Sequence, residues 1–98
     1  MAFRLIIRPE AELDIESSAL WYEQQQRGLG DRFLDGLNEV FVRVTEQPLR
    51  FPQIRKNVRR ALLGRFPYGV YFVPESDRVI VIAVLHLRRH PDTWRRRA

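Results

Sequence analysis

The run Val-Ile-Val-Ile-Ala-Val-Leu at positions 79–85 constrains the fold more than any other segment. Every side chain in the run is apolar, so a strand formed there needs cover on both of its faces. Such strands lie inside a sheet, between other strands and between packed layers. We therefore expect residues 79–85 to form the central strand of a sheet that is covered on both sides.

The clearest helical periodicity lies in residues 31–47. Apolar side chains recur there at spacings of three and four, which places them on one face of a helix. Pro48 ends this helix, because proline lacks the amide hydrogen that a helix interior uses. The face that we expect to be buried consists of Phe33, Leu37, Val40, Phe41 and Val44.

A second helix is predicted over residues 10–26, after Pro9, which suits a first helical turn. Acidic side chains crowd its early turns, where the positive end of the helix dipole favours them. Gly28 and Gly30 form a short turn, with Gly28 a candidate for the left-handed conformation, so the two helices should pair as an antiparallel hairpin. The expected apolar stripe contains Ile15, Ala19 and Tyr22, widened by Leu13, Leu20 and Trp21.

Three further strands join the central one. Alternation and β-branched residues predict strands at 3–8, 58–63 and 70–73. Residues 74–77 form a turn that joins the strand at 70–73 to the strand at 79–85. The fold class is therefore α+β: an N-terminal strand, an antiparallel two-helix hairpin, then a mostly antiparallel sheet of three further strands. Residues 1–98 are expected to be a single domain, with a basic tail from about residue 88 to residue 98.

Charge is unevenly distributed along the chain. Residues 1–46 hold nine acids and five bases, a net charge of −4, whereas residues 47–98 hold three acids and twelve bases, a net charge of +9. All the basic residues except Lys56 are arginine. Arginine binds phosphate and carboxylate groups in a forked geometry, which suits a nucleic acid or an acidic protein. Codon usage that favours arginine explains the arginine excess but not its position.

Several function classes find no support. Cysteine is absent, which excludes disulfides and thiolate chemistry. No P-loop, dinucleotide fingerprint, HExxH or nucleophile elbow is present, so we expect no cofactor. His86 and His90 lie four residues apart, but Arg88 and Arg89 beside them disfavour a metal. Without a signal peptide or a transmembrane segment, the chain is expected in the cytoplasm, with no membrane partner.

Basic residues form two candidate binding groups. The first surrounds the strand at 58–63 and could hold phosphates, although edge strands also carry charge that blocks pairing with other chains. The second lies in the tail and is either a flexible phosphate-binding arm or a solvated terminus. The first group is Arg55, Lys56, Arg59, Arg60 and Arg65, and the second is Arg88, Arg89, Arg95, Arg96 and Arg97.

Histidines and aromatic residues near these groups are the other candidates. His86, at the end of the central strand, and His90 could transfer protons near neutral pH, or could be hydrogen-bonded structural residues. Tyr68 could stack on a base, whereas Tyr71 is expected in the core. Trp94 either docks against the body of the protein or belongs to a binding surface.

The ordered set of segments resembles the RelE/ParE superfamily of toxins from type II toxin–antitoxin systems. The stretch Phe-Pro-Tyr-Gly-Val-Tyr-Phe at 66–72 and the segment 79–91, followed by Trp94, resemble its C-terminal half. Glu-Ala-Glu-Leu-Asp at 10–14, Tyr-Glu at 22–23, Gly-Leu-Gly-Asp-Arg-Phe at 28–33, and the Gln-Pro and Phe-Pro pairs at 47–48 and 51–52 resemble its first half. The resemblance covers nearly the whole chain.

This resemblance implies a toxin that is neutralised by a ParD-like antitoxin encoded beside it, in a hetero-oligomer. RelE-like members are implied to be ribosome-dependent mRNA endonucleases, with His86, His90, Arg59, Arg65 and Arg88 as catalytic positions here. ParE-like members are implied to inhibit DNA gyrase by binding and not by catalysis. The residues that would bind the target or the antitoxin are Arg55, Arg59, Arg60, Arg65, Tyr68, Arg88, Arg89 and Trp94.

Three functions stay open, and the ParE-like one is favoured. The segment between the helices, two helices of nearly equal length and the Phe-Pro-Tyr segment resemble that branch more closely. Lys56 is the only lysine, whereas RelE-like enzymes are typically lysine-rich at the active surface, and arginine is a poor proton donor at neutral pH. A non-toxic nucleic-acid-binding module is the third alternative, although no helix-turn-helix or zinc pattern supports it.

Overall fold

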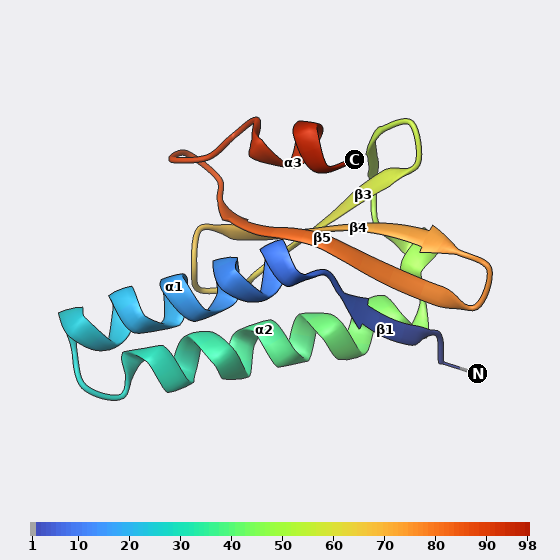
Figure 1. Ribbon diagram of the computed structural model, residues 1–98. Coiled ribbons are helices and arrows are strands. Elements are labelled where there is room, and N and C mark those ends of the chain that lie inside the picture. Colours follow the sequence, from blue (N-terminus) through green and yellow to red (C-terminus); the bar gives the residue numbers. More distant parts are fainter. Residues whose placement is uncertain (1) are drawn as a thin grey trace.

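The computed structural model describes residues 2–98 and has three layers (Figure 1). A two-helix hairpin covers one face of a five-stranded sheet, and a short C-terminal helix lies on the other face. Met1, the first residue of the expected domain, lies outside the described residues. The elements are β1 Arg4–Ile7, α1 Pro9–Gln25, α2 Leu29–Glu46, the 3-10 turn η1 Pro48–Arg50, β2 Gln53–Arg55, β3 Val58–Leu62, β4 Tyr68–Glu75, β5 Arg78–His86 and α3 Thr93–Arg97.

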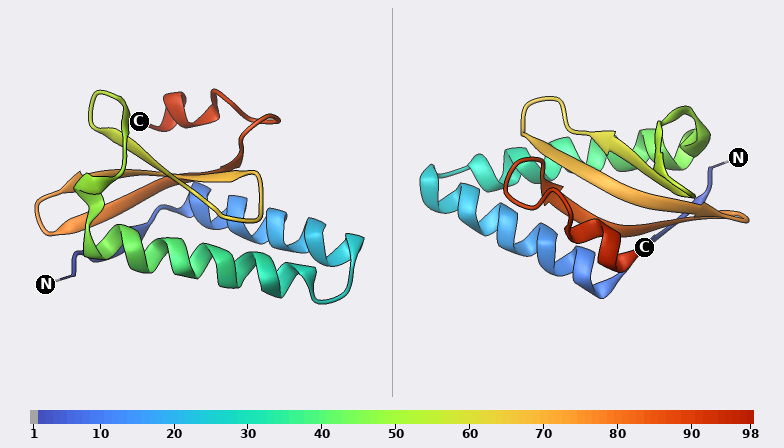
Figure 2. Two further views of the ribbon diagram at one scale, coloured as in Figure 1. Left: turned by 180° about the vertical axis from the view of Figure 1, so that it is seen from behind. Right: turned by 90° about the horizontal axis from the view of Figure 1, so that it is seen from above.

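The sheet has the strand order β1-β5-β4-β3-β2. Strand β1 runs parallel to β5, and every other neighbouring pair is antiparallel. Residues Val79 to Leu85 of β5 are buried, so the prediction of a central strand covered on both faces is confirmed. The α+β class with an N-terminal strand, two helices and a mostly antiparallel sheet is likewise confirmed (Figure 2).

The core fills both spaces between the layers. On the hairpin side, all five residues of the periodic stripe of α2 are buried against the sheet, as predicted. Aromatic rings gather at one end of this core, where Tyr22 and Phe33 contact Phe66 and Tyr68. On the opposite side, Trp94 of α3 packs on Tyr71, which confirms that Tyr71 is a core residue.

Helix α1 differs from the expectation. Ala11 and Tyr22 are its buried residues, whereas Leu13, Leu20 and Trp21 are 62%, 60% and 42% exposed. The prediction that these three widen the buried stripe is therefore wrong. Successive helical residues are rotated by about 100°, so Leu13 lies roughly opposite Ala11 on the helix. With α2 and the sheet covering one side of α1, its outer side stays open.

Further differences concern short elements and turns. Strand β2 and helix α3 were not expected from the sequence, and β4 continues through Pro74 and Glu75, which were predicted as a turn. The turn itself contains only Ser76 and Asp77. Pro74 fits in the strand because β3 pairs with β4 only as far as Phe72, so no neighbour on that side needs a donor at position 74.

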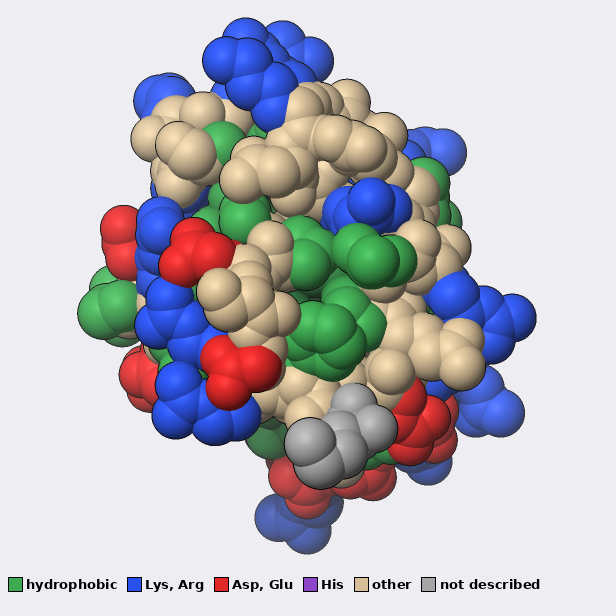
Figure 3. Space-filling view, turned by 90° about the vertical axis from the view of Figure 1, so that its right-hand side faces the viewer, with side chains coloured by type: hydrophobic (Ala, Val, Ile, Leu, Met, Phe, Trp, Pro, Cys, Tyr) green, Lys and Arg blue, Asp and Glu red, His purple; other side chains and the backbone are tan. Residues whose placement is uncertain are grey.

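The end of the molecule near the N-terminus is partly apolar. Figure 3 shows apolar side chains at the middle of this end, with Lys and Arg side chains around the rim. A shallow hollow there is lined by Phe3, Pro48 and Leu49, and Leu49 is 67% exposed. Among residues 2–98, no helix is long and apolar enough to cross a membrane.

Candidate functional site

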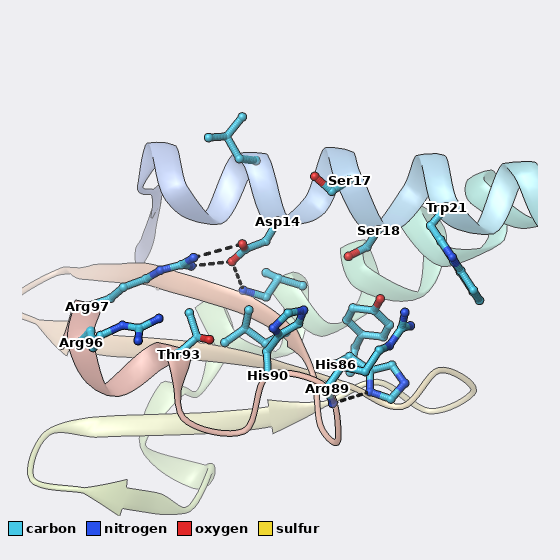
Figure 4. Close-up of a pocket in the computed structure, with 14 residues that line it drawn as sticks. Asp14, Ser17, Ser18, Trp21, His86, Arg89, His90, Thr93, Arg96 and Arg97 are labelled. Atoms are coloured by element: carbon cyan, nitrogen blue, oxygen red, sulfur yellow. Dashed lines mark hydrogen bonds and ion pairs between the residues drawn. The ribbon is translucent and has the colours of Figure 1, made fainter.

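A groove of about 530 Å³ lies between α1, the end of β5 and the C-terminal segment (Figure 4). Helix α1 contributes Leu13, Ser17 and Trp21 to one wall. Because β5 ends at His86 and the chain turns back toward α3, the opposite wall is made by residues that are close in sequence. These residues are His86, Arg89, His90, Thr93 and Arg96.

An ion pair closes the floor of this groove. Strand β1 pairs with β5 only as far as Val81, so the outer edge of β5 has no strand neighbour beyond that point. The Asp14 carboxylate accepts the backbone N–H of Val84 at 3.0 Å, and the Arg97 guanidinium donates to the carbonyl of Ile82 at 3.1 Å. The two side chains also contact each other at 2.6 and 3.2 Å. Asp14 and Arg97 thus take the place of a missing strand.

His86 is held as a neutral hydrogen-bond acceptor. Its Nδ1 accepts the backbone N–H groups of Arg88 and Arg89 at 3.1 and 3.2 Å, so the ring proton lies on Nε2. Burial lowers the pKa of His86 below its ordinary value, and the positive charge of Arg89, with His90 and Arg88, lowers it further. Protonation would break both hydrogen bonds, which makes His86 a poor general base. The structural alternative for this residue is therefore the better supported one.

Trp21 and Arg89 join the two walls of the groove. The guanidinium of Arg89 lies over the Trp21 ring, 4.9 Å from its centroid, in a cation–π contact. Tyr68 lines the groove with part of its side chain but is only 5% exposed, and its ring packs edge-on against His86. His90 is exposed, and its backbone N–H donates to the carbonyl of His86.

The arginines around β3 lie elsewhere. Arg59 donates to the carbonyl of Phe51 at 2.7 Å and so fixes the segment before β2. The stem of Arg60 lies over Gly69, where an added Cβ would meet it at 3.2 Å, and within residues 2–98 its buried Nε has no hydrogen-bond partner. Arg55 is exposed on β2.

The remaining candidates are also separate from the groove. Arg65 lines another hollow, of about 500 Å³, with residues of α2 such as Arg32 and Arg43. Arg88 is exposed after the end of β5. Trp94 is 5% exposed, stacks on Tyr71 with ring centroids 5.6 Å apart, and donates its indole N–H to the Pro91 carbonyl at 2.9 Å.

The tail is therefore not a flexible arm. Its α3 segment is fastened to the sheet by Trp94 and to α1 by Arg97, and Arg8 donates to the Arg97 carbonyl at 3.0 Å. The sequence suggested that Trp94 docks against the body, and the structure confirms that alternative. It also suggested a flexible arm or a solvated terminus. The packing of α3 contradicts the flexible arm, whereas Arg95 and Arg96 are exposed to solvent.

The structure brings together only part of the predicted set. Tyr68, His86, Arg89 and His90 line one groove, whereas Arg59 and Arg65 lie at other places. Asp14 was read as a helix-dipole acid, and no local pattern marks it as a partner, because Val84 and Arg97 are 70 and 83 residues away. Within residues 2–98, no three His, Asp or Glu side chains gather in a metal-binding cluster.

Residues 5–91 match the family model described as the ParE toxin of the type II toxin–antitoxin system parDE. The chain belongs to the ParE toxin family. This ParE-family chain is similar in fold to a solved structure described as the chromosomal ParDE TA system from P. aeruginosa, with a TM-score of 0.76 and 13% identity over 87% of this chain and 96% of that chain. No curated protein matches it significantly.

The family match includes the helical hairpin and all of the sheet except Arg4, the first residue of β1. It ends at Pro91, so α3 and its arginines lie beyond the matched residues of this ParE-family toxin. The groove wall formed by Thr93 and Arg96 therefore lies outside the matched range, whereas the α1 wall and His86 lie inside it.

Proposed function

We propose that this ParE-family protein is neutralised by an adjacent antitoxin and arrests growth by inhibiting DNA gyrase, as a binding protein and not as a nuclease. Membership in the family and the resemblance to the ParE-like branch support the target. The net charge of +9 in residues 47–98 suits either an acidic antitoxin or a nucleoprotein target. The protein would encounter both proposed partners, the antitoxin and DNA gyrase, in the cytoplasm.

The scattering of the candidate catalytic groups supports the non-enzymatic part of the proposal. RNA cleavage through the 2′-hydroxyl needs a base, an acid and a cation gathered around one phosphate. Here Arg59 is held by the Phe51 carbonyl, and Arg65 lines a different hollow. His86 is neutral with its accepting nitrogen occupied, so it offers neither a base nor a strong acid.

The experiment that tests this proposal is macromolecular synthesis after induction of the chain without its antitoxin. Labelled thymidine and labelled amino acid are followed in one culture. We expect DNA synthesis to fail first, with a DNA-damage response, and purified gyrase to lose supercoiling activity when the protein is added. The variants His86→Ala and His90→Ala serve as matched controls and should remain toxic.

Other outcomes identify the alternatives. Protein synthesis that fails first, together with loss of toxicity in one histidine variant that still binds the antitoxin, supports the ribosome-dependent endonuclease. Continued growth of induced cells, with nucleic-acid binding that is lost when arginines are replaced, supports a non-toxic nucleic-acid-binding module. Either result contradicts gyrase inhibition.

A further inference from the structure

Strands β2 and β3, with the turn between them, form a two-stranded ribbon that carries only positive charge. This basic ribbon, residues 53–62, holds four bases and no acid, and the acid-free stretch around it extends from residue 47 to residue 74. None of the ion pairs formed within residues 2–98 involves the ribbon. Its charge is therefore not neutralised by the protein's own carboxylates. The four bases are Arg55, Lys56, Arg59 and Arg60.

The basic ribbon ends in a tight turn that presents a lysine. Arg55 is paired with Val58 in the sheet, so the turn consists of Lys56 and Asn57 alone. Lys56 has a φ of 45°, in the left-handed region that lysine rarely adopts. A residue held in a rarely populated conformation points to a functional reason for its presence. Figure 1 shows this turn extending from the sheet on the side of α3, and Lys and Arg side chains lie at the top of Figure 3, at the height of the turn.

The base of the ribbon is fixed to the rest of the fold. The Arg59 guanidinium donates to the carbonyls of Phe51 and Leu49 at 2.7 and 3.4 Å. The backbone N–H of Arg60 donates to the carbonyl of Pro52 at 3.2 Å, and β3 also pairs with β4. The bases are therefore held in one arrangement before any ligand binds, which lowers the entropy cost of binding.

The other side chains of the ribbon favour a double-stranded nucleic acid over a protein. Its exposed residues from Gln53 to Asn57 are all polar, and Leu62 at the far end of β3 is its one exposed apolar residue, whereas a protein interface needs apolar anchors. Residues 53–65 include no aromatic side chain, so the ribbon lacks the platform on which single-stranded bases stack. The phosphates of a double helix require only positive charge and hydrogen-bond donors.

We propose that the basic ribbon binds the phosphate backbone of duplex DNA. A two-stranded ribbon fits the major groove of B-form DNA, which is about 12 Å wide and is bordered by phosphates on both sides. The major groove of double-stranded RNA is too narrow to admit it. Contacts to phosphates carry no sequence information, so binding does not depend on base sequence. The inference rests on the proposed function, because gyrase acts on duplex DNA and the ribbon would hold the toxin on that DNA.

The test measures binding of a 20-base-pair DNA duplex by fluorescence anisotropy. The double variant Arg55→Gln/Lys56→Gln removes two charges from the ribbon, and we expect it to bind at least about tenfold more weakly, because fewer counterions are released from the phosphates. The slope of log affinity against log salt should become less negative by about 1 for each charge removed. The matched control, Arg4→Gln/Arg27→Gln, removes the same charge at exposed positions outside the ribbon and should change the affinity by less than about threefold.

Competing ligands identify the class of molecule that binds. Single-stranded DNA of the same length, an RNA duplex and polyglutamate are titrated in the same buffer, and we expect the DNA duplex to bind more tightly than each of them. A competitor that binds as tightly as the DNA duplex overturns the assignment to duplex DNA. Equal weakening in the ribbon variant and the control overturns the ribbon as the site, because net charge alone would then explain binding. Thermal unfolding establishes that each variant keeps its fold.

Supercoiling by purified gyrase separates this inference from the proposed function. We expect the ribbon variant to need about tenfold more protein than wild type for equal inhibition, in step with its loss of DNA affinity. If wild type inhibits gyrase but binds the duplex no more tightly than the ribbon variant, the ribbon site is overturned and the proposed function stands. If wild type binds the duplex through the ribbon but leaves gyrase active, gyrase inhibition is overturned and the ribbon site stands. If the ribbon variant loses DNA binding but inhibits gyrase as strongly as wild type, the role of the ribbon in the toxin's action is overturned.

Discussion

Asp14 shows how one side chain can complete a sheet. Its carboxylate accepts the Val84 amide and binds the Arg97 guanidinium, which in turn satisfies the Ile82 carbonyl. The side chains of Asp14 and Arg97 are only 14% and 19% exposed, so each charge depends on the other for its solvation. Breaking a buried pair costs more than the pair contributes, because a lone charge is left behind.

We therefore predict that Asp14→Ala lowers the free energy of unfolding by about 3–5 kcal/mol. The Val84 amide should also lose its protection against hydrogen exchange, because its acceptor is gone. Urea titration and amide exchange measure the two effects. Glu75→Ala removes the exposed Arg78–Glu75 pair and should cost less than about 1 kcal/mol, so an equal loss in both variants contradicts the prediction.

The lowered pKa of His86 predicts how the stability of the protein depends on pH. The fold lowers its pKa below 6.5, so as the pH falls the unfolded chain binds a proton first. The stability that His86 contributes is complete above about pH 6.5 and is lost as the pH falls through the lower pKa of the folded state. His86→Asn keeps an acceptor but does not titrate. As the pH falls below 6.5, the free energy of unfolding of the wild type should therefore decrease relative to that of His86→Asn.

Two measurements check this behaviour. Denaturant midpoints of the wild type and His86→Asn at several pH values between 5 and 8 give the stability difference, and effects of other titrating groups cancel in it. Long-range nitrogen–proton NMR correlations identify the tautomer, and the proton of the neutral ring is expected on Nε2. A proton on Nδ1, or a pKa above 6.5, would show that the hydrogen bonds from Arg88 and Arg89 are not formed.

Among the helices and strands, those whose burial follows a local sequence pattern were predicted correctly. The stripe of α2 is regular and faces the core, and the apolar run at 79–85 is central, because periodicity directly encodes which face is buried. Helix α1 misled the same reasoning, because Leu13 and Leu20 resemble core residues but face outward. Strand β2, three residues long, and the docked α3 depend on contacts distant in sequence, which a local pattern does not contain.

The candidate site was predictable only in part for the same reason. His86 and Arg89 were identified from the chemistry of their side chains, and they do line a common groove. Their grouping with Arg59 and Arg65 as catalytic positions was what the resemblance to RelE-like enzymes implied, and not a result of local pattern. The alternation of β3 and the turn after it send those two arginines to different neighbours.

The close packing of the helical hairpin predicts opposite effects on stability for alanine at Gly30 and at Gly36. A Cβ at Gly30 would lie 2.7 Å from the backbone carbonyl of Ala19, because α1 and α2 approach closely there. Gly30→Ala should therefore destabilise the protein by about 1–3 kcal/mol. Gly36, also in α2, has nothing within 4 Å of such a Cβ, so Gly36→Ala should stabilise the helix by up to about 1 kcal/mol. Thermal unfolding distinguishes the two, and effects of the same sign would refute the packing argument.

For the whole molecule, the separation of charge predicts how partners approach. Residues 1–46 carry −4 and residues 47–98 carry +9, and both the arginines of the groove wall and those of β2 and β3 belong to the second part. The association rate with an acidic partner should therefore fall at least tenfold between about 0.05 and 0.5 M salt, because screening removes long-range attraction. Stopped-flow mixing measures this rate. A rate that does not change with salt would mean that the apolar contacts alone guide association.

The parallel pairing of β1 with β5 also sets when this protein can fold. Arg4 lies opposite Arg78, so the first strand to be synthesised waits for one of the last before it gains its neighbour. Contacts this distant in sequence form late and slowly, because the loop between them must first be ordered. While the chain is still being translated, the sheet has no centre and the hairpin has no surface on which to pack. We therefore expect the sheet to be completed only after most of the chain has been synthesised.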